Sequence, residues 1–420
     1  MRVLVAPHEL AIGGSQINAI DLAAGVAAAG HEVAVWGMPG PLVDHVAARG
    51  LEFIPARTLR YRPAPSRIAQ LMAVAASRRL DLVHAYEWPP CLDAYYGAHL
   101  TLRTRLVCTV LSMAVSPLVP ASVPLIMGTA ALGDQARRSH RAPVWVIEPP
   151  IDTDADHPGI DGSGFRQEHG ADHDTLLVVT VSRLAVDLKL DALVRAIDAV
   201  DMLAGRLPVR LLLVGDGPAG DALRARARAV NARWGRNVVA FTGAMPDPRH
   251  AYAAADVVVG MGSSALRAMS IGRPVVVQGE RGFSEIFEPA TYGHFLRHGF
   301  WGLGDDAPGA HRLAGQLAGL LADRERRRAL GTLGRRVVVE RYALRRSVGA
   351  LLGVYGQVLE HQPRRRPADV VATAARAVQV EVHNHDPRRK RLRAGVEHAR
   401  LRAARRPAAT GGRLLPEAAA

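Results

Sequence analysis

The stretch AYAAADVVVGMGSSALRAMSIGRPVVV, residues Ala251–Val277, decides the fold. Its pattern predicts a buried strand at Val257–Val259, a loop of small residues at Gly260–Ser264, a short helix at Ala265–Ser270 and a second buried strand at Pro274–Val277. Such a loop lets backbone N–H groups approach an anion at a helix N-terminus, where the dipole adds about 0.3–1 kcal/mol, and this suits a diphosphate. A tight turn in any parallel α/β sheet explains the loop equally well, so the rest of the chain has to decide.

Three further segments extend the alternation of buried strands and helices. Val178–Ile197 predicts a strand, a loop that carries Arg183 and Lys189, and a helix with one apolar face. Leu211–Pro218 and Val238–Gly243 are short apolar runs that end at glycines. Strands that alternate with helices in this way predict a parallel sheet, and they favour the anion-binding interpretation of the loop.

The N-terminal half has the same character. MRVLVA predicts a strand, and a loop with Gly13 and Gly14, a helix and the turn GHEV into a second strand follow it. DLVHA at Asp81–Ala85 and VIEPPIDTDADHP at Val146–Pro158 are two more distinctive segments. In this order and spacing, all these segments resemble the GT-B glycosyltransferases, specifically the retaining, glycogen-synthase-like family 4. The resemblance covers roughly residues 1–360 and rests on the order of the motifs, because none is diagnostic alone.

This resemblance implies an α/β chain with the GT-B fold, in which two Rossmann-like domains face each other across a cleft. We expect an acceptor domain at residues 1–160, a nucleotide-sugar domain at 161–340 and a helix at 341–360 that crosses back to the first domain. The nucleotide-sugar then lies at the carboxyl ends of the second domain's strands, as ligands do in open α/β sheets. Prolines, glycines and acidic residues at 149–174 interrupt the pattern and place the boundary there.

Two basic residues are the catalytic candidates. A glycosyl bond that breaks through an oxocarbenium-like state leaves negative charge on the departing diphosphate, and fixed cations stabilise this charge without a metal. Arg183 and Lys189 match the Arg–Lys pair that has this role in the family. Their spacing alone would favour ordinary surface charges, so the assignment depends on the flanking strand and helix.

The resemblance places the donor against small residues and one glutamate. The implied donor-binding residues are Gly13, Gly14, Gly215, Gly262, Ser263, Ser264 and Glu285. The first two glycines let their loop approach the phosphate or sugar, because a Cβ there would clash. The serines supply backbone and hydroxyl donors at the start of a helix, and the glutamate matches one that relatives place near the sugar hydroxyls. A helix cap or an ion pair at a helix start is the structural alternative for Glu285.

Polar and aromatic residues at strand ends of the first domain are candidates for the acceptor side. They are His84, Glu87, Trp88 and Ser112. Trp88 suits stacking on an acceptor ring, and Glu87 suits binding of hydroxyls or assistance in proton transfer. Ordinary packing or exposure to solvent is the alternative for each.

The chain departs from the family pattern at three places. Relatives carry two glutamates around the phosphate loop, and the aligned residues here are Val259 and Arg267. Thr109 is not followed by the usual Thr-X-His histidine, and Pro149-Pro150 stands where Asn-Gly is common. These changes indicate either a divergent branch with its own donor geometry or an enzyme that has lost catalysis. We favour the divergent branch, because distinctive polar residues remain clustered at the strand ends.

Composition sets limits on the interpretation. The chain has 420 residues, 49% of them hydrophobic, and no apolar run approaches the roughly 20 residues of a membrane span. Two cysteines, Cys91 and Cys108, do not make a disulfide framework, so we expect a cytoplasmic protein. His31, His294 and His298 show no metal-ligand spacing. We therefore expect no metal and no cofactor besides the nucleotide-sugar substrate.

Residues 361–420 carry much of the charge, with 14 Lys and Arg against 5 Asp and Glu, a net of +9 of the chain's +14. This segment contains PRRRP and DPRRKRLR and lacks aromatic residues, which predicts a solvated tail that is disordered or loosely helical. Contact with the anionic surface of a membrane is the functional alternative. No nucleic-acid recognition motif is present, so we expect no nucleic-acid partner.

These observations predict a hexosyltransferase-type enzyme that moves a sugar from a nucleotide-diphosphate donor, such as a UDP- or GDP-sugar, to an unidentified glycan, lipid or small-molecule acceptor. Retention of the anomeric configuration is implied by the resemblance alone. A nucleotide-sugar 2-epimerase-like enzyme would need carboxylates around the sugar, which the sequence does not reveal. A non-catalytic binding module stays open as an alternative, because the usual acids are missing at Val259 and Arg267.

Overall fold

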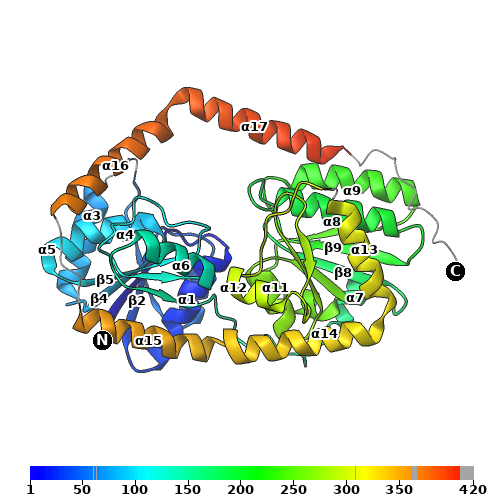
Figure 1. Cartoon of the computed structure of the whole chain (residues 1–420), viewed down its shortest axis with the longest axis horizontal. Helices are drawn as coiled ribbons and strands as arrows, with labels where there is room; N and C mark the ends of the chain where they lie inside the picture. Colours follow the sequence, from blue (N-terminus) through cyan, green and yellow to red (C-terminus); the bar gives the residue numbers. More distant parts are fainter. Residues whose placement is uncertain (60, 63, 308, 362–366, 407–420) are drawn as a thin grey trace.

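The structure is a computed structural model that describes residues 1–59, 61–62, 64–307, 309–361 and 367–406. Two α/β domains lie side by side, each with a central sheet covered by helices on both faces (Figure 1). No helix within these ranges has both the length and the apolar character that crossing a membrane requires.

The first domain contains a seven-stranded sheet in the order β3-β2-β1-β4-β5-β6-β7, and all its neighbouring strands are parallel. The strands are β1 Arg2–Ala6, β2 Glu32–Gly37, β3 Glu52–Pro55, β4 Leu82–Tyr86, β5 Arg105–Val110, β6 Leu125–Met127 and β7 Val144–Val146. The helices are α1 Gly14–Ala28, α2 Val43–Ala48, α3 Pro65–Ser77, α4 Trp88–Ala94, α5 Leu100–Leu102 and α6 Ala130–Ser139, with a π-helical turn at Tyr95–His99.

The second domain contains a six-stranded sheet in the order β10-β9-β8-β11-β12-β13, in which only the β12–β13 pair is antiparallel among the described residues. Its strands are β8 Leu176–Val181, β9 Val209–Val214, β10 Val239–Gly243, β11 Val257–Gly260, β12 Val275–Gln278 and β13 Ser284–Ile286. Its helices are α7 Ser163–Glu168, α8 Leu190–Leu203, α9 Gly220–Trp234, α10 Arg249–Ala254, α11 Ser263–Ser270, α12 Tyr292–His298, α13 Gly309–Ala322 and α14 Arg324–Val337, with a π-helical turn at Val338–Tyr342.

Burial explains why the central strands are almost entirely aliphatic. Val257, Val258 and Val259 of β11 are at most 1% exposed, and they point alternately into the two apolar cores of the second domain. A parallel strand covered by helices on both faces has no solvent side, so its sequence shows a continuous apolar run. The predicted strand–loop–helix–strand order at Ala251–Val277 is confirmed, with the helix beginning slightly earlier, at Ser263.

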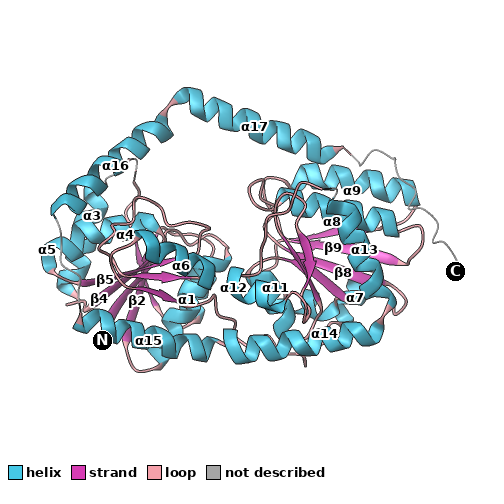
Figure 2. Ribbon diagram, viewed as in Figure 1, coloured by secondary structure: helices cyan, strands magenta, loops and turns pink. Residues whose placement is uncertain are grey.

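A long helix, α15 Leu344–Glu360, returns from the second domain to the first (Figure 2). Its apolar residues belong to the core between α1 and the first sheet, and they are Val348, Leu351, Val354, Tyr355 and Val358. Gly25 of α1 lies directly against Val348, so the two helices approach closely. The predicted crossing helix is therefore confirmed.

The chain continues into two more helices, α16 Pro367–His385 and α17 Pro387–Arg405. Of the two expectations for this segment, a disordered tail is wrong for these residues and a helical one is confirmed, and both helices are tied to folded domains. The Tyr96 hydroxyl donates to the Val370 carbonyl at 2.6 Å, and Ala404 is buried in a core of the second domain. The rest of the predicted tail, residues 362–366 and 407–420, lies outside the described residues.

Candidate active site

The loops at the carboxyl ends of the two sheets meet between the domains. Gly13 caps the start of α1 and Gly14 is its first residue, and a Cβ on Gly14 would lie 2.9 Å from the Ser263 hydroxyl oxygen of α11. This contact brings one predicted donor loop from each domain together. The small residue at position 14 is what leaves room for the approach.

Arg183 and Lys189 lie on the loop between β8 and α8. Arg183 is exposed, and Lys189 is half-buried at the position just before α8. Burial and the nearby Arg183 charge lower the pKa of Lys189 to about 8. Neither side chain has a hydrogen bond or an ion pair among the described residues, so the loop presents positive charge without a protein counter-ion.

Backbone hydrogen bonds to the β9–α9 turn hold this loop in place. The Leu184 amide donates to the Asp216 carbonyl at 2.9 Å, and the Ala219 amide donates to the Leu184 carbonyl at 2.8 Å. Gly215 has φ +141°, and a Cβ there would collide with the Ser182 carbonyl. Gly215 thus acts by allowing two backbone segments to pack, which fixes the Arg183 loop in place.

The start of α11 offers donors in the same region. Gly262 has φ +58° and donates its amide to the Phe300 carbonyl at 2.6 Å. The amides of Ser263 and Ser264 have no acceptor among the described residues, as is usual in a first helical turn. The Ser264 hydroxyl accepts a hydrogen bond from the Tyr252 hydroxyl at 3.1 Å, whereas the Ser263 hydroxyl has no partner in the described part of the chain.

An ion pair stands at the position where relatives carry a glutamate. The Arg267 guanidinium donates to both carboxylate oxygens of Asp156, at 2.8 and 3.1 Å. Burial opposes the charge on Arg267, but the hydrogen bonds and charge of Asp156 raise its pKa overall. Val259, at the other aligned position, is buried in β11, so neither position carries an acid. Asp156 was not among the predicted site residues, because its partner lies 111 residues away in the sequence.

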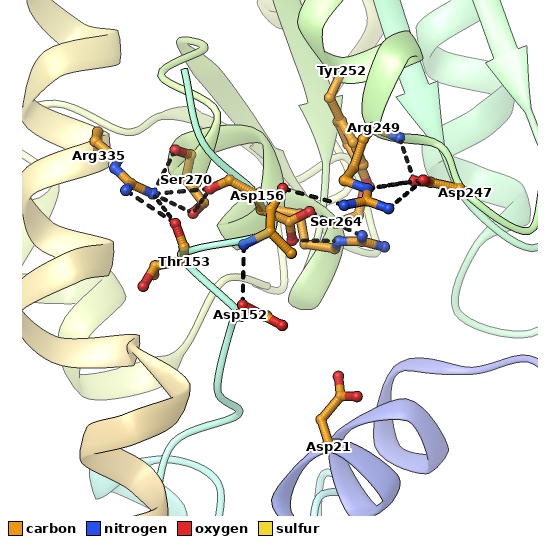
Figure 3. Close-up of polar contacts among 12 residues, drawn as sticks. Asp21, Asp152, Thr153, Asp156, Asp247, Arg249, Tyr252, Ser264, Ser270 and Arg335 are labelled. Carbon is orange, nitrogen blue, oxygen red and sulfur yellow. Dashed lines mark hydrogen bonds and ion pairs between the residues drawn. The ribbon is translucent and has the colours of Figure 1, made fainter. Parts of the chain in front are cut away.

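The segment that connects the domains is held from both sides. Arg335 of α14 donates to the carbonyls of Thr153 and Asp156, at 3.1 and 2.9 Å (Figure 3). Arg49 of the first domain lies 3.4 Å from Asp152 and 2.9 Å from Asp21 of α1. These contacts fix the connecting segment against α1 and α11, next to the meeting point of the two donor loops.

Glu285 lies in β13, at the edge of the second sheet, in register with Val277. Its carboxylate is half-buried and has no partner among the described residues. The structural alternative of a cap or ion pair at a helix start is wrong, because the residue belongs to a strand. The Glu285 carboxylate is thus free to bind a ligand, and its predicted contact with the sugar stays a prediction.

Two of the acceptor-side candidates are joined directly. The Glu87 carboxylate accepts hydrogen bonds from the Leu111 amide at 2.8 Å, the Ser112 amide at 2.9 Å and the Ser112 hydroxyl at 2.8 Å. Glu87 also has φ +68°, an uncommon conformation for a non-glycine residue that is enriched at functional sites. It follows β4 directly and shapes the loop after β5, so it organises the surface at the carboxyl edge of the first sheet.

Trp88 and His84 have different surroundings. Trp88 begins α4, and the Arg62 guanidinium lies 5.3 Å from its ring centroid, so part of the ring is already covered. His84 is 1% exposed, and its two ring nitrogens lie 2.7 Å from the Tyr355 hydroxyl and 2.6 Å from the Thr109 hydroxyl. Burial lowers the pKa of His84 to about 3. This enclosure contradicts the predicted acceptor contact and makes His84 a structural link between the first sheet and α15.

No cluster of three His, Cys, Asp or Glu side chains that could hold a metal occurs in the described residues. Cys91 and Cys108 are both buried and free. Of the predicted site residues, Gly14 and Ser263 come together between the domains, and Glu87 and Ser112 meet at the carboxyl edge of the first sheet. Arg183 and Lys189 lie on the β8–α8 loop of the second domain, and Glu285 lies on its edge strand β13.

Two family models match the chain. "Glycosyl transferases group 1" matches residues 175–323, which contain the second sheet. "Glycosyltransferase Family 4" matches residues 12–122 of the first domain. No curated protein matches the chain in sequence.

Solved glycosyltransferases have the same architecture. One from Rickettsia africae is 13% identical, with a TM-score of 0.70 over 86% of this chain and 99% of that one. HepE from Anabaena, solved with UDP and glucose, is 19% identical, with a TM-score of 0.66 over 85% of this chain and 99% of its own. WaaG, a glycosyltransferase involved in lipopolysaccharide biosynthesis, is 17% identical, with a TM-score of 0.58 over 83% of this chain and 99% of its own. At these identities, the likeness shows the fold.

The paired sheets and the returning helix α15 define the GT-B class of glycosyltransferases, and the predicted fold class is confirmed. With a matching family model in each domain, the chain belongs to the family 4-like GT-B glycosyltransferases.

Proposed function

We propose that this glycosyltransferase moves a sugar from a nucleotide-diphosphate donor to an acceptor bound on the first domain. The observation that carries the proposal is the unpaired positive charge of Arg183 and Lys189, on a loop at the carboxyl end of β8. Two cations without a protein counter-ion, one of them half-buried, are costly unless an anionic ligand compensates them. The HepE structure with UDP and glucose makes a UDP-sugar the first donor to test.

In this proposal the diphosphate lies between the basic loop and the start of α11. Arg183 and Lys189 stabilise the negative charge that develops on the leaving phosphate oxygens. The amides of Ser263 and Ser264 donate to the same phosphates. The loop with Gly13 and Gly14, which comes close to Ser263, covers the site from the first domain. No metal is needed for this charge compensation. Retention of the anomeric configuration is part of the proposal on the basis of family resemblance.

The acceptor occupies the carboxyl edge of the first sheet. Glu87, held by Ser112 and the Leu111 amide, binds an acceptor hydroxyl or receives its proton. The free carboxylate of Glu285 contacts the sugar hydroxyls from the opposite domain. The acceptor is a glycan, a lipid or a small molecule, and the proposal includes peripheral contact between the basic C-terminal segment and an anionic membrane.

A non-catalytic nucleotide-binding module is the second candidate. The specific observation in its favour is the Asp156–Arg267 ion pair, which occupies a position where relatives have an acid. Such a module would bind the nucleotide-sugar and would not release the nucleoside diphosphate.

A thermal-shift panel of UDP-, GDP-, ADP- and dTDP-sugars tests the donor site. A ligand at about 100 times its Kd adds about 2.7 kcal/mol of apparent stability. We expect one nucleotide class to raise the Tm of the wild type and to lose this effect in the double variant Arg183→Ala/Lys189→Ala. The matched control is Arg206→Ala/Arg228→Ala, at two exposed positions of the same domain. No shift with any donor would contradict the proposal.

A further inference from the structure

The helices α16 and α17, residues 367–405, form a strap that is attached to both domains (Figure 1). At the first domain, Thr373 and Ala377 of α16 are at most 4% exposed, and the Glu381 carboxylate accepts from the Arg62 amide at 3.0 Å. These contacts hold α16 against the face that contains α3 and α4. The first end of the strap is therefore fixed.

The second end of the strap is fixed on α9. Arg226 donates to the Ala404 carbonyl at 3.2 Å and is itself paired with Asp198 at 2.6 Å. Arg400 lies 3.3 Å from Asp187, on the loop that carries Lys189. Because both ends are held, the part of the strap between them keeps a defined position relative to the two domains.

His385, just before the bend, still contacts the first domain, with its ring centroid 5.0 Å from that of Tyr61, but among the described residues no hydrogen bond or ion pair joins residues 387–399 to either domain. All residues from 387 to 400 are exposed, and Figure 1 shows the bend between α16 and α17 as the part of the strap farthest from both sheets. Five basic residues follow this bend, namely Arg388, Arg389, Lys390, Arg391 and Arg393. Arg389 is 3.7 Å from Asp386, and no acidic side chain of the described residues pairs with the other four.

Large apolar side chains are also exposed on both sides of the bend. Val378 and Val382 on α16 are 50% and 69% exposed, and Leu392 and Val396 on α17 are 69% and 53% exposed. Each pair is spaced by four residues, so its members lie on one helix face. None of the four belongs to an apolar cluster of the described residues. These four side chains are therefore exposed and have no apolar partner in the part of the chain that the structure describes.

We propose that the bend of the strap docks on an anionic membrane surface. A basic residue near such a surface strengthens binding about fivefold, and exposed aliphatic side chains beside the charges have a place in the lipid interface. The charges alone would also suit nucleic acid, but three valines and one leucine exposed beside them would gain nothing from contact with a nucleic acid. The inference deepens the proposed function, because it places the peripheral membrane contact at this bend, and it rests on that function in one respect: docking here would serve an acceptor held at the membrane.

The test is co-sedimentation of the full chain with phosphatidylcholine vesicles and with vesicles that also contain phosphatidylglycerol. The bend variant neutralises four cations: Arg388→Gln, Lys390→Gln, Arg391→Gln and Arg393→Gln. The control makes the same change in net charge on α14 and α15, along the opposite edge in Figure 1: Arg324→Gln, Arg328→Gln, Arg336→Gln and Arg346→Gln. All eight positions are exposed and lack ion pairs with described residues, so both variants should fold.

We expect the wild type to bind only the anionic vesicles, with an affinity that falls as salt is added. The bend variant should bind at least about a hundredfold more weakly, and the control should keep most of its binding. The proposal is overturned if the wild type does not bind anionic vesicles, if the bend variant binds as the wild type does, or if both variants lose binding equally.

A second variant, Val382→Ser/Leu392→Ser, separates a membrane from other partners. A membrane contact predicts weaker binding to anionic vesicles, at least about threefold, with unchanged binding to duplex DNA. The wild type could instead bind DNA and vesicles with equal affinity, and both affinities could be the same in this variant. That result would assign the bend to nucleic acid and overturn the proposal. A dimer that dissociates in the variant without loss of vesicle binding would assign the apolar faces to a second copy of the chain, with the same consequence.

The same protein samples are tested for a nucleotide-induced rise in Tm, which keeps the two proposals apart. Vesicle binding without any nucleotide effect supports the docking surface and contradicts the transferase proposal. A nucleotide effect without vesicle binding supports the donor site and overturns the docking surface.

Discussion

Arg267 and Asp156 form an ion pair that joins α11 to the segment connecting the two domains. The Asp156 side chain is 4% exposed, and its two oxygens accept from the Arg267 guanidinium at 2.8 and 3.1 Å. Tyr252, whose hydroxyl donates to Ser264, lies beneath the guanidinium, with 6.0 Å between its ring centroid and the guanidinium carbon. This pair, together with Tyr252, therefore connects the segment between the two domains to Ser264 of the proposed donor site.

Asp156→Ala should lower the free energy of unfolding by about 3 kcal/mol, because it leaves Arg267 largely buried without its carboxylate partner. Urea denaturation measures this change. Asp156→Ala/Arg267→Leu should recover part of the loss. The control is Asp154→Ala, whose side chain is 86% exposed and pairs with the 93% exposed Arg345, and it should cost less than about 0.5 kcal/mol. Equal effects of the two single substitutions would contradict a structural role for the pair.

Donor affinity should depend on pH through Lys189. Burial and the neighbouring Arg183 lower its pKa from 10.5 to about 8. The ammonium is charged below this pH, so the affinity for UDP should be full there and should fall as the pH rises through about 8. Calorimetric titration of UDP over this range measures the effect. Lys189→Arg should remove the pH dependence of UDP binding. Arg183→Ala should weaken UDP binding but leave its pH dependence in place. A flat profile in the wild type would show that Lys189 does not face the diphosphate.

Glu87→Ala should reduce turnover by at least about tenfold, because the loop at Leu111 and Ser112 loses the carboxylate that holds it and the acceptor loses a polar contact. Binding of the nucleotide should stay unchanged, since Glu87 lies on the first domain. Release of the nucleoside diphosphate with a crude acceptor extract measures turnover. Glu52→Ala, which breaks an exposed pair with Arg78 on the same domain, is the control and should keep full activity. A change in nucleotide affinity without a change in turnover would contradict this role and assign Glu87 to donor binding.

His84 should make the protein sensitive to acid. Burial lowers its pKa to about 3 from 6.5, so the unfolded chain binds more protons between these values and stability falls as the pH falls below 6.5. In His84→Gln this contribution should disappear, and the loss of stability on acidification should be smaller by about 4 kcal/mol. Denaturant unfolding at a series of pH values measures both slopes. Parallel slopes would mean that His84 is protonated in the folded state.

The sequence predicts best where one local pattern determines the structure. The valine runs of β11 and β12 and the small residues between them define a strand, a turn and a helix without reference to the rest of the chain. The apolar face of α15 and its place on α1 could likewise be expected from the family order of elements. The Arg183 and Lys189 loop follows from its flanking strand and helix.

The features that the sequence did not predict depend on contacts between residues far apart in the chain. Asp156 and Arg267 find each other only after the connecting segment packs on α11, and no local pattern indicates this pairing. His84 looks like an exposed strand-end residue until α15 brings Tyr355 over it, 271 residues later. The basic run after Pro387 predicted a disordered or loosely helical tail, and it could not show that Leu401 and Ala404 at the far end pack into the second domain's core and hold the segment as a helix.

The most direct test of the central claim is the release of nucleoside diphosphate by the full chain, measured with the donor that the thermal-shift panel selects and a crude acceptor extract. We expect release by the wild type and a loss of at least about a hundredfold in Arg183→Ala/Lys189→Ala, because the departing phosphate oxygens then lack both cations. Donor binding without release in the presence of any acceptor would contradict the transferase and identify a nucleotide-sugar-binding module on the same fold.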